Sequence, residues 1–119
     1  RVIRHEPLGF FDYNKLQQNA FCVVSDSGTL PEEGAYFRFP AVSVRTSTER
    51  PEAMENGIFT VGCITTEQVL QAVALATSMH ADGDYGAAVC AYCDTCVSAK
   101  VVKLIQSYTG IINKMVWRK

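Results

Sequence analysis

The stretch from Phe21 to Glu52 reads FCVVSDSGTLPEEGAYFRFPAVSVRTSTERPE, and it carries most of the information about the fold. Its pattern predicts a strand, a short polar turn, a helix, a second strand and a second polar loop that opens another helix. Alternating strands and helices predict an α/β fold with a parallel sheet. Both polar segments follow predicted strands directly, and open α/β sheets bind their ligands at the carboxyl ends of strands.

The first polar turn follows residues 21–24, an apolar run typical of a strand buried on both faces. Thr29 and Glu32 have the spacing of a capping box, and Pro31 suits a first helical turn. Unpaired N–H groups at a helix start favour an anion, and Gly28 would let a phosphate approach the backbone. The same residues also fit an ordinary, well-capped connection, so both interpretations stay open.

The second polar loop, residues 45–52, follows a predicted strand at 40–44 and carries two arginines and three hydroxyl side chains. The guanidinium group matches phosphate through its planar fork of donors. Adjacent parallel strands lie about 5 Å apart, so two paired strands would turn both loops toward one diphosphate. The alternative is that Glu49 and Arg50 are only surface charges at a helix end.

The rest of the chain predicts further short elements around this centre. Arg1–His5 fits an edge strand, and a helix over Asp12–Ala20 would be capped by Asp12, with Tyr13, Leu16 and Ala20 on one face. The remaining predictions are helices at Leu30–Arg38 and Pro51–Glu55, a strand at Ile58–Cys63, and a helix from the Thr65–Gln68 capping box to His80 with a buried stripe of Val69, Leu70, Val73, Ala76 and Met79. A loop over His80–Tyr92 would follow. We therefore predict a Rossmann-like parallel sheet of about four short strands flanked by helices.

A long amphipathic helix is predicted over Cys96–Val116. Its apolar residues follow a heptad pattern: Val97, Val101, Leu104, Ile105, Tyr108, Ile111, Ile112 and Met115. Leaving such side chains in water costs roughly 1.5–3 kcal/mol each, so the stripe predicts a covering surface. We expect residues 1–95 to form a partial Rossmann-like unit and residues 96–119 to serve packing or homo-oligomerisation.

Composition narrows the class of protein. A chain of 119 residues with 48% hydrophobic residues is one domain at most, with a real core. The net charge of −1 implies no general attraction to nucleic acid or to a membrane surface. No apolar run approaches the roughly 18 residues of a transmembrane helix.

The five cysteines leave one alternative open. Cys90, Cys93 and Cys96 form a C-x-x-C-x-x-C run, which can cradle zinc or an iron–sulfur cluster if His80 or Asp94 supplies a fourth ligand. We favour plain thiols of a cytoplasmic protein, with no metal and no cofactor. Two further cysteines, Cys22 and Cys63, fall in predicted strands and are expected to be buried.

SDSGTLPEEG (25–34) followed by STERPEA (47–53) resembles the signature of the non-hydrolysing UDP-N-acetylglucosamine 2-epimerase family. GFFDYNKLQQNA (9–20) and the end from Lys100 are most similar to the branch that makes UDP-N-acetyl-L-fucosamine for surface polysaccharides by inverting C2 of UDP-2-acetamido-2,6-dideoxy-L-talose. The resemblance implies a GT-B fold with UDP-sugar between two Rossmann-like domains. This chain corresponds to the last part of the second domain, and its start at Arg1 suggests a truncated, processed or tag-derived N-terminus.

The resemblance also implies roles for single residues. Thr29 stands where the family usually has a second glycine, and Tyr13 on local grounds alone would be a surface or core-edge aromatic. The implied UDP-binding set comprises Ser27, Gly28 and Thr29 at the phosphates, Arg50 near the phosphates, Glu33 at the ribose hydroxyls and Tyr13 against uracil.

The chemistry implied by the resemblance needs groups that this chain lacks. In the family, UDP is eliminated by cleavage of C1–O with loss of the C2 proton, and then adds back to the glycal. The carboxylates, histidine and basic residues that do this lie in segments with no counterpart here. The acidic residues Glu32, Glu33, Glu49 and Glu52 are explained as partners of helix dipoles. We predict no catalytic residue and no epimerisation by the chain alone; the alternatives are a free-standing binding or assembly module and a thiol or metal protein.

Overall fold

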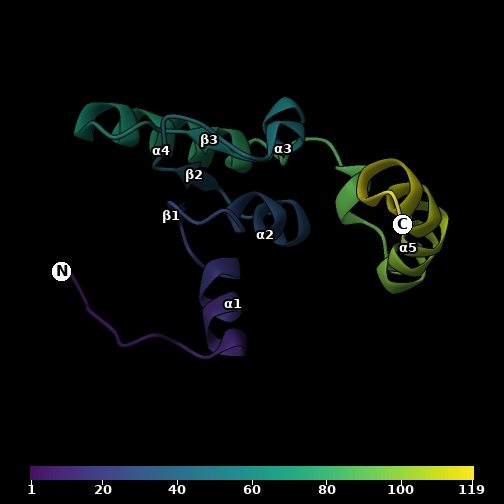
Figure 1. The fold of residues 1–119 in the computed structure, drawn as a ribbon. Coiled ribbons are helices and arrows are strands. Elements are labelled where there is room, and N and C mark those ends of the chain that lie inside the picture. The colour runs from purple at the N-terminus through teal and green to yellow at the C-terminus, as the bar shows by residue number, and fades with distance from the viewer.

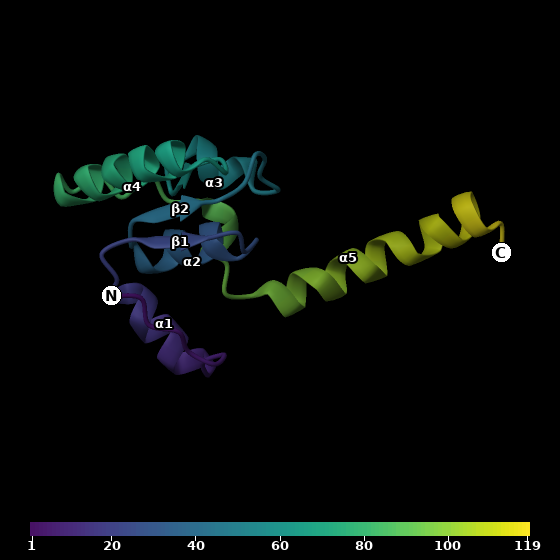
Figure 2. The ribbon, with the colours of Figure 1, turned by 90° about the vertical axis from the view of Figure 1, so that its left-hand side faces the viewer.

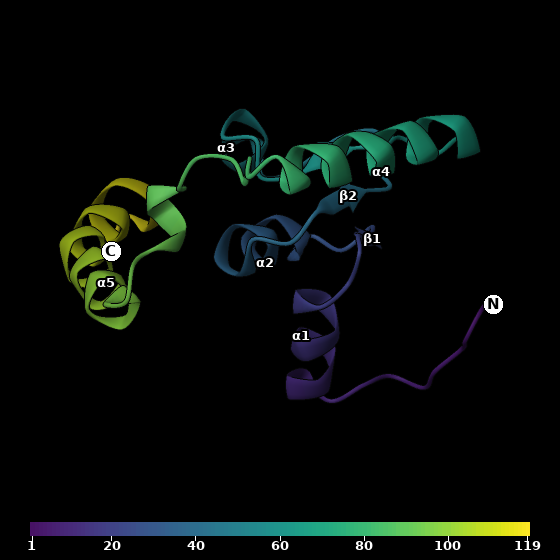
Figure 3. The same cartoon turned by 180° about the vertical axis from the view of Figure 1, so that it is seen from behind.

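The computed structural model describes all 119 residues and has a three-stranded parallel sheet at its centre. The strands β1 (Val23–Ser25), β2 (Ala41–Ser43) and β3 (Thr60–Val61) lie side by side in that order. Helix α2 (Leu30–Phe37) packs on one face of the sheet, and α4 (Thr66–Ala81) packs on the other (Figures 1 and 3). The predicted α/β class and the parallel sheet are therefore confirmed.

The core surrounds the central strand. All three residues of β2 are buried, and Val42 is completely enclosed. The hydrophobic cluster joins residues of α2, of β2 and the segment before it, of α3 (Pro51–Glu55), of the segment before β3 and of the later segment near residue 89. Its members are Leu30, Phe39, Ala41, Ala53, Ile58, Phe59 and Val89.

Two predictions about strands are wrong. Residues 1–5 form no strand and are exposed, because no neighbouring strand offers them hydrogen bonds; the sheet has three strands rather than about four. The first strand is not buried on both faces either. It lies at the sheet edge, where Val24 is 45% exposed and the preceding Phe21 is 80% exposed.

Helix α1 (Phe10–Gln18) begins two residues earlier than the predicted Asp12. Its N-cap is Gly9, and no side chain caps it. The buried residues of this helix are Asn14 and Gln17, not the predicted Tyr13–Leu16–Ala20 face. The inward face of α1 is therefore polar.

Helix α4 has the predicted start. The Thr65 hydroxyl accepts a hydrogen bond from the Gln68 N–H, which confirms the cap. Of the predicted stripe, Val69, Val73 and Ala76 are half-buried around the buried Ala72, whereas Leu70 and Met79 are exposed, so the buried stripe is narrower than predicted.

The chain ends in α5 (Val97–Ile112), which continues as a π-helical turn over Asn113–Trp117. A short 3₁₀ helix, η1 (Cys90–Tyr92), precedes it. Figure 2 shows α5 extending away from the sheet, so that the structure spans 61 Å along its longest axis. The predicted helix is confirmed, and its heptad stripe is exposed throughout. No helix has the length and hydropathy needed to cross a membrane.

Candidate nucleotide site at the carboxyl edge of the sheet

Two polar loops leave the carboxyl ends of β1 and β2 side by side. Ser25 pairs with Ser43 in the sheet, and the Val44 N–H donates to the Ser25 carbonyl at 3.0 Å. From the second loop, Arg45 Nε donates to the Asp26 carbonyl of the first at 2.6 Å. The predicted pairing of these strands is confirmed, and it joins the two loops into one surface.

The first loop is a tight turn closed by its own hydroxyl groups. The Ser27 N–H donates to Ser25 Oγ, and the Thr29 N–H donates to Ser27 Oγ. Thr29 Oγ1 lies 3.0 Å from Ser27 Oγ and makes no cap to the helix. The predicted capping box with Glu32 is wrong, because Ser27 engages the threonine hydroxyl and the Thr29 backbone is already helical.

Gly28 lies at the open side of this turn. A Cβ atom built on it would meet no other atom within 4 Å, so nothing inside the chain requires glycine here. Its N–H donates to no protein acceptor. The start of α2, with Pro31 and two acidic residues in its first turn, lies directly beside it. A free N–H at the positive end of a helix favours an anion.

The polar face of α1 meets α2 near Glu33. Gln17 Nε2 donates to Glu33 Oε2 at 2.7 Å, while the buried Gln17 Oε1 has no hydrogen-bond partner. Burial, and secondarily the negative charge of Glu33, raises the pKa of Tyr13. Tyr13 and Glu33, both predicted site residues, therefore lie in one neighbourhood. Gln17 was not predicted, although its four-residue spacing from Tyr13 places it on the same side of the helix.

Arg50 is held at the start of α3. Its Nε donates to Glu32 Oε1 at 2.7 Å, its Nη1 donates to the Glu49 carbonyl at 3.2 Å, and its backbone N–H is held by Thr48 Oγ1. The hydrogen bond and the charge of Glu32 raise the pKa of Arg50. A guanidinium has five N–H donors, so three remain for a ligand. The ion pair with Glu32 was not predicted.

A tyrosine from the distant η1 segment reaches the same region. Tyr92 donates its hydroxyl hydrogen to Glu52 Oε1 at 2.6 Å. This bond is the main cause that lowers the pKa of Glu52, and burial together with Glu52 raises the pKa of Tyr92 to about 12. The two residues are 40 positions apart, and no sequence signal could have paired them.

The cysteines are not arranged as a metal site in this structure. The structure brings no three His, Cys, Asp or Glu side chains together in a way that would hold a metal ion. All five cysteines are free; Cys93 Sγ points to the Val89 carbonyl, and Cys22 and Cys63 are half-buried rather than buried. Of the two further ligands that we considered, Asp94 pairs with Lys100, and His80 lies against the Arg38 carbonyl.

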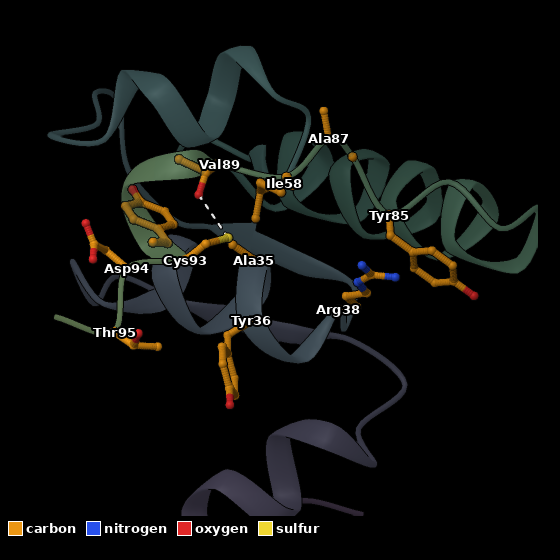
Figure 4. Close-up of a pocket in the computed structure, with 13 residues that line it drawn as sticks. Ala35, Tyr36, Arg38, Ile58, Tyr85, Ala87, Val89, Cys93, Asp94 and Thr95 are labelled. Carbon is orange, nitrogen blue, oxygen red and sulfur yellow. Dashed lines mark hydrogen bonds between the residues drawn. The ribbon is translucent and has the colours of Figure 1, made fainter.

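A cavity lies elsewhere, between α2 and the segment that leads into α5. It encloses about 450 Å³ and is lined by residues such as Ala35, Arg38, Tyr85 and Cys93 (Figure 4). None of the predicted UDP-binding residues lines it. The candidate site is thus an open surface of two loops and two helices, not this cavity.

Comparison with known proteins agrees with the fold. A solved structure of UDP-N-acetylglucosamine 2-epimerase from Rickettsia bellii is 40% identical and superposes with a TM-score of 0.83 over 98% of this chain and 32% of that one. UDP-N-acetylglucosamine 2-epimerases from Methanocaldococcus jannaschii and Methanococcus maripaludis are 33% and 31% identical over 59% and 68% of this chain.

The match extends over most of this chain but over a small part of its relatives. The chain spans only 19% and 23% of the two archaeal proteins. The family model for UDP-N-acetylglucosamine 2-epimerase matches residues 1–106. This chain therefore belongs to the UDP-N-acetylglucosamine 2-epimerase family.

Proposed function

We propose that this chain is the UDP-binding part of a nucleotide-sugar C2 epimerase. The observation that carries the proposal is the joining of the two polar loops at the carboxyl edge of the sheet, with Arg45 of one bonded to the backbone of the other. Gly28, with free space around it and an unbonded N–H, and Arg50, with three unused donors, lie on these loops. The surface thus offers donors of the kind that a diphosphate needs.

The proposed roles follow from the chemistry of each group. Ser27, Gly28 and Thr29 would donate to the phosphates with Arg50. Glu33, whose second oxygen is free of Gln17, would accept from the ribose diol. Tyr13, partly exposed on α1, would lie against the uracil ring.

Catalysis is proposed to need groups outside this chain. An epimerase that eliminates and re-adds UDP requires a base at C2 and acids or cations near the leaving oxygen. Two carboxylates of this site already have partners within the chain: Glu32 pairs with Arg50, and Glu52 accepts a hydrogen bond from Tyr92. The chain alone should therefore bind UDP without epimerising its sugar.

The identity of the sugar is a finer part of the proposal. The similarity of residues 9–20 and 100–119 to the L-fucosamine branch favours a UDP-2-acetamido-2,6-dideoxyhexose over UDP-N-acetylglucosamine, in surface-polysaccharide synthesis. A cytoplasmic location agrees with five unpaired cysteines.

Calorimetric titration of the reduced chain with UDP tests the proposal, with uridine and inorganic phosphate as comparison ligands. We expect a dissociation constant between about 1 μM and 1 mM. Arg50→Ala should weaken UDP binding about tenfold or more, since a hydrogen bond to a charged group contributes roughly 1.5–3 kcal/mol. Lys103→Ala on α5 removes one positive charge far from the loops and should leave the affinity unchanged. A folded chain that does not bind UDP would refute the proposal.

A second candidate function is assembly. The exposed heptad stripe of α5 favours a chain that self-associates or docks on another surface through this helix. Stable oligomers without affinity for UDP would favour this alternative over nucleotide binding.

A further inference from the structure

We infer that Tyr92 is a positioning residue for Arg50: its hydroxyl holds the Glu52 carboxylate away from the guanidinium and so keeps that group free for a phosphate. The inference rests on the proposed function, because it concerns how the UDP surface is kept ready. The hydrogen bond from Tyr92 to Glu52 joins η1, which precedes α5, to the start of α3.

Two carboxylates lie near Arg50, and they have different hydrogen-bond partners. Glu32 on α2 takes the Nε–H of Arg50 at 2.7 Å. Glu52 lies two residues after Arg50 in the first turn of α3, yet it makes no ion pair with it. Its Oε1 atom instead accepts from Tyr92 at 2.6 Å. One carboxylate thus orients the guanidinium, and the other is held by a neutral partner.

The net charge around Arg50 explains why this matters. Paired with Glu32 alone, Arg50 forms a neutral unit that still has three free donors. If Glu52 also bonded to the guanidinium, Arg50 would be paired with two carboxylates, and fewer of its N–H donors would remain free. A diphosphate would then face a site with fewer donors and a negative charge.

The phenol is well placed to act as a fixed anchor. Tyr92 is half-buried, and its ring packs against the core cluster that contains Val89. Its N–H donates to the Val89 carbonyl at 3.0 Å, and the Cys93 N–H donates to the Cys90 carbonyl at 3.2 Å. A residue held by its own turn and by the core limits where Glu52 can move. Tyr85, by contrast, lies at the far end of the cavity in Figure 4, and its hydroxyl makes no hydrogen bond.

Substitution of the hydroxyl tests the inference. Tyr92→Phe should weaken UDP binding about three- to tenfold, the range of one hydrogen bond, and leave uridine binding unchanged. In the double variant Tyr92→Phe with Glu52→Gln, the neutral amide cannot compete as an ion, so affinity should return to within about twofold of the wild type. Tyr85→Phe is the matched control and should bind as the wild type does.

The outcomes separate the inference from the proposed function. If the wild type binds UDP and Tyr92→Phe binds equally well, the inference is wrong. It is also wrong if the single and double variants are equally weak, because Tyr92 would then act only through the fold. If the wild type does not bind UDP, the proposed function fails, and the NMR resonance of the Arg50 Nε–H decides the inference. That resonance should shift in Tyr92→Phe and return in the double variant; an unchanged resonance overturns it.

Discussion

Gly28 and Gly62 show how differently two glycines serve one chain. A Cβ atom on Gly62 would lie 2.9 Å from Val42 Cγ1 and 3.3 Å from the Ala72 Cβ, in the packed interface between the sheet and α4. A Cβ atom on Gly28 would project into open space at the candidate phosphate site. Glycine at 62 is required by packing, whereas at 28 we attribute it to the ligand.

Alanine substitution at these two positions should separate stability from binding. Gly62→Ala should lower the free energy of unfolding by about 1–3 kcal/mol, because β-branched Val42 is buried and cannot move aside cheaply. Gly28→Ala should leave stability within about 0.5 kcal/mol but weaken UDP binding severalfold. Urea denaturation and calorimetry give the two quantities. Equal affinity of Gly28→Ala and wild type would count against close approach of the phosphate to this backbone.

The hydrogen bond from Tyr92 should make stability depend on pH through Glu52. The bond lowers the pKa of folded Glu52 below the ordinary value of 4.5. A carboxyl whose pKa falls on folding stabilises the protein above its unfolded pKa, and this contribution disappears as pH falls through the folded pKa. The stability difference between wild type and Glu52→Gln should therefore shrink below pH 4.5. Denaturant unfolding at a series of acidic pH values checks this, and a difference that stays constant with pH would contradict it.

Among the helices and strands, local sequence signals correctly predicted the helix ends that depend on neighbouring residues alone. Pro51 with Asn56-Gly57 gave the correct bounds of α3, and Thr65 gave the correct start of α4. The predictions were wrong where a structure depends on a competing hydrogen-bond partner or on tertiary packing. Ser27 takes the hydroxyl that would have capped α2, and residues 1–5 have no strand to pair with.

The same distinction divides the candidate site. Both loops and their meeting could be predicted, because parallel strands bring their carboxyl ends to one edge of a sheet. The polar contacts that hold the site could not: Gln17–Glu33 and Tyr92–Glu52 join residues 16 and 40 positions apart. Such pairs depend on how helices pack, which neither periodicity nor capping patterns describe.

Two threonines at helix starts should differ in how much they stabilise the fold. Thr65→Ala removes a hydroxyl that accepts the Gln68 N–H and should cost about 0.5–2 kcal/mol of unfolding free energy. Thr29→Ala removes a hydroxyl that caps nothing, so its cost should be clearly smaller. Urea denaturation of both variants measures the difference. A larger loss for Thr29→Ala would show that α2 is capped after all.

At the scale of the whole molecule, α5 differs from the rest of the chain. All 12 acidic residues lie before residue 97, whereas every charged residue in the stretch 97–119 is basic. Its apolar stripe is exposed beside these charges. A helix that is both apolar and basic favours a partner surface that is apolar with an acidic rim. Residues 1–96 of a second copy, which hold all the acidic residues, could supply such a surface.

Self-association through α5 is therefore expected to depend on concentration. Sedimentation should show a mass above 13.1 kDa that rises with protein concentration. Leu104→Glu places a charge in the middle of the stripe and should return the monomer, while Gln106→Glu on the polar side should not. A single monomeric species of the wild type at high concentration would mean that the stripe needs a different partner.

Binding of UDP by the loops at the carboxyl edge of the sheet can be located residue by residue in an NMR titration. Amide and Arg50 Nε resonances of the isotope-labelled chain would be followed as UDP is added. We predict saturable shifts confined to residues 27–33 and 45–52 and to the facing side of α1, with the cavity residues 85–89 and α5 unchanged. Shifts centred on the cavity, or none at all in a folded chain, would show that these loops do not bind UDP.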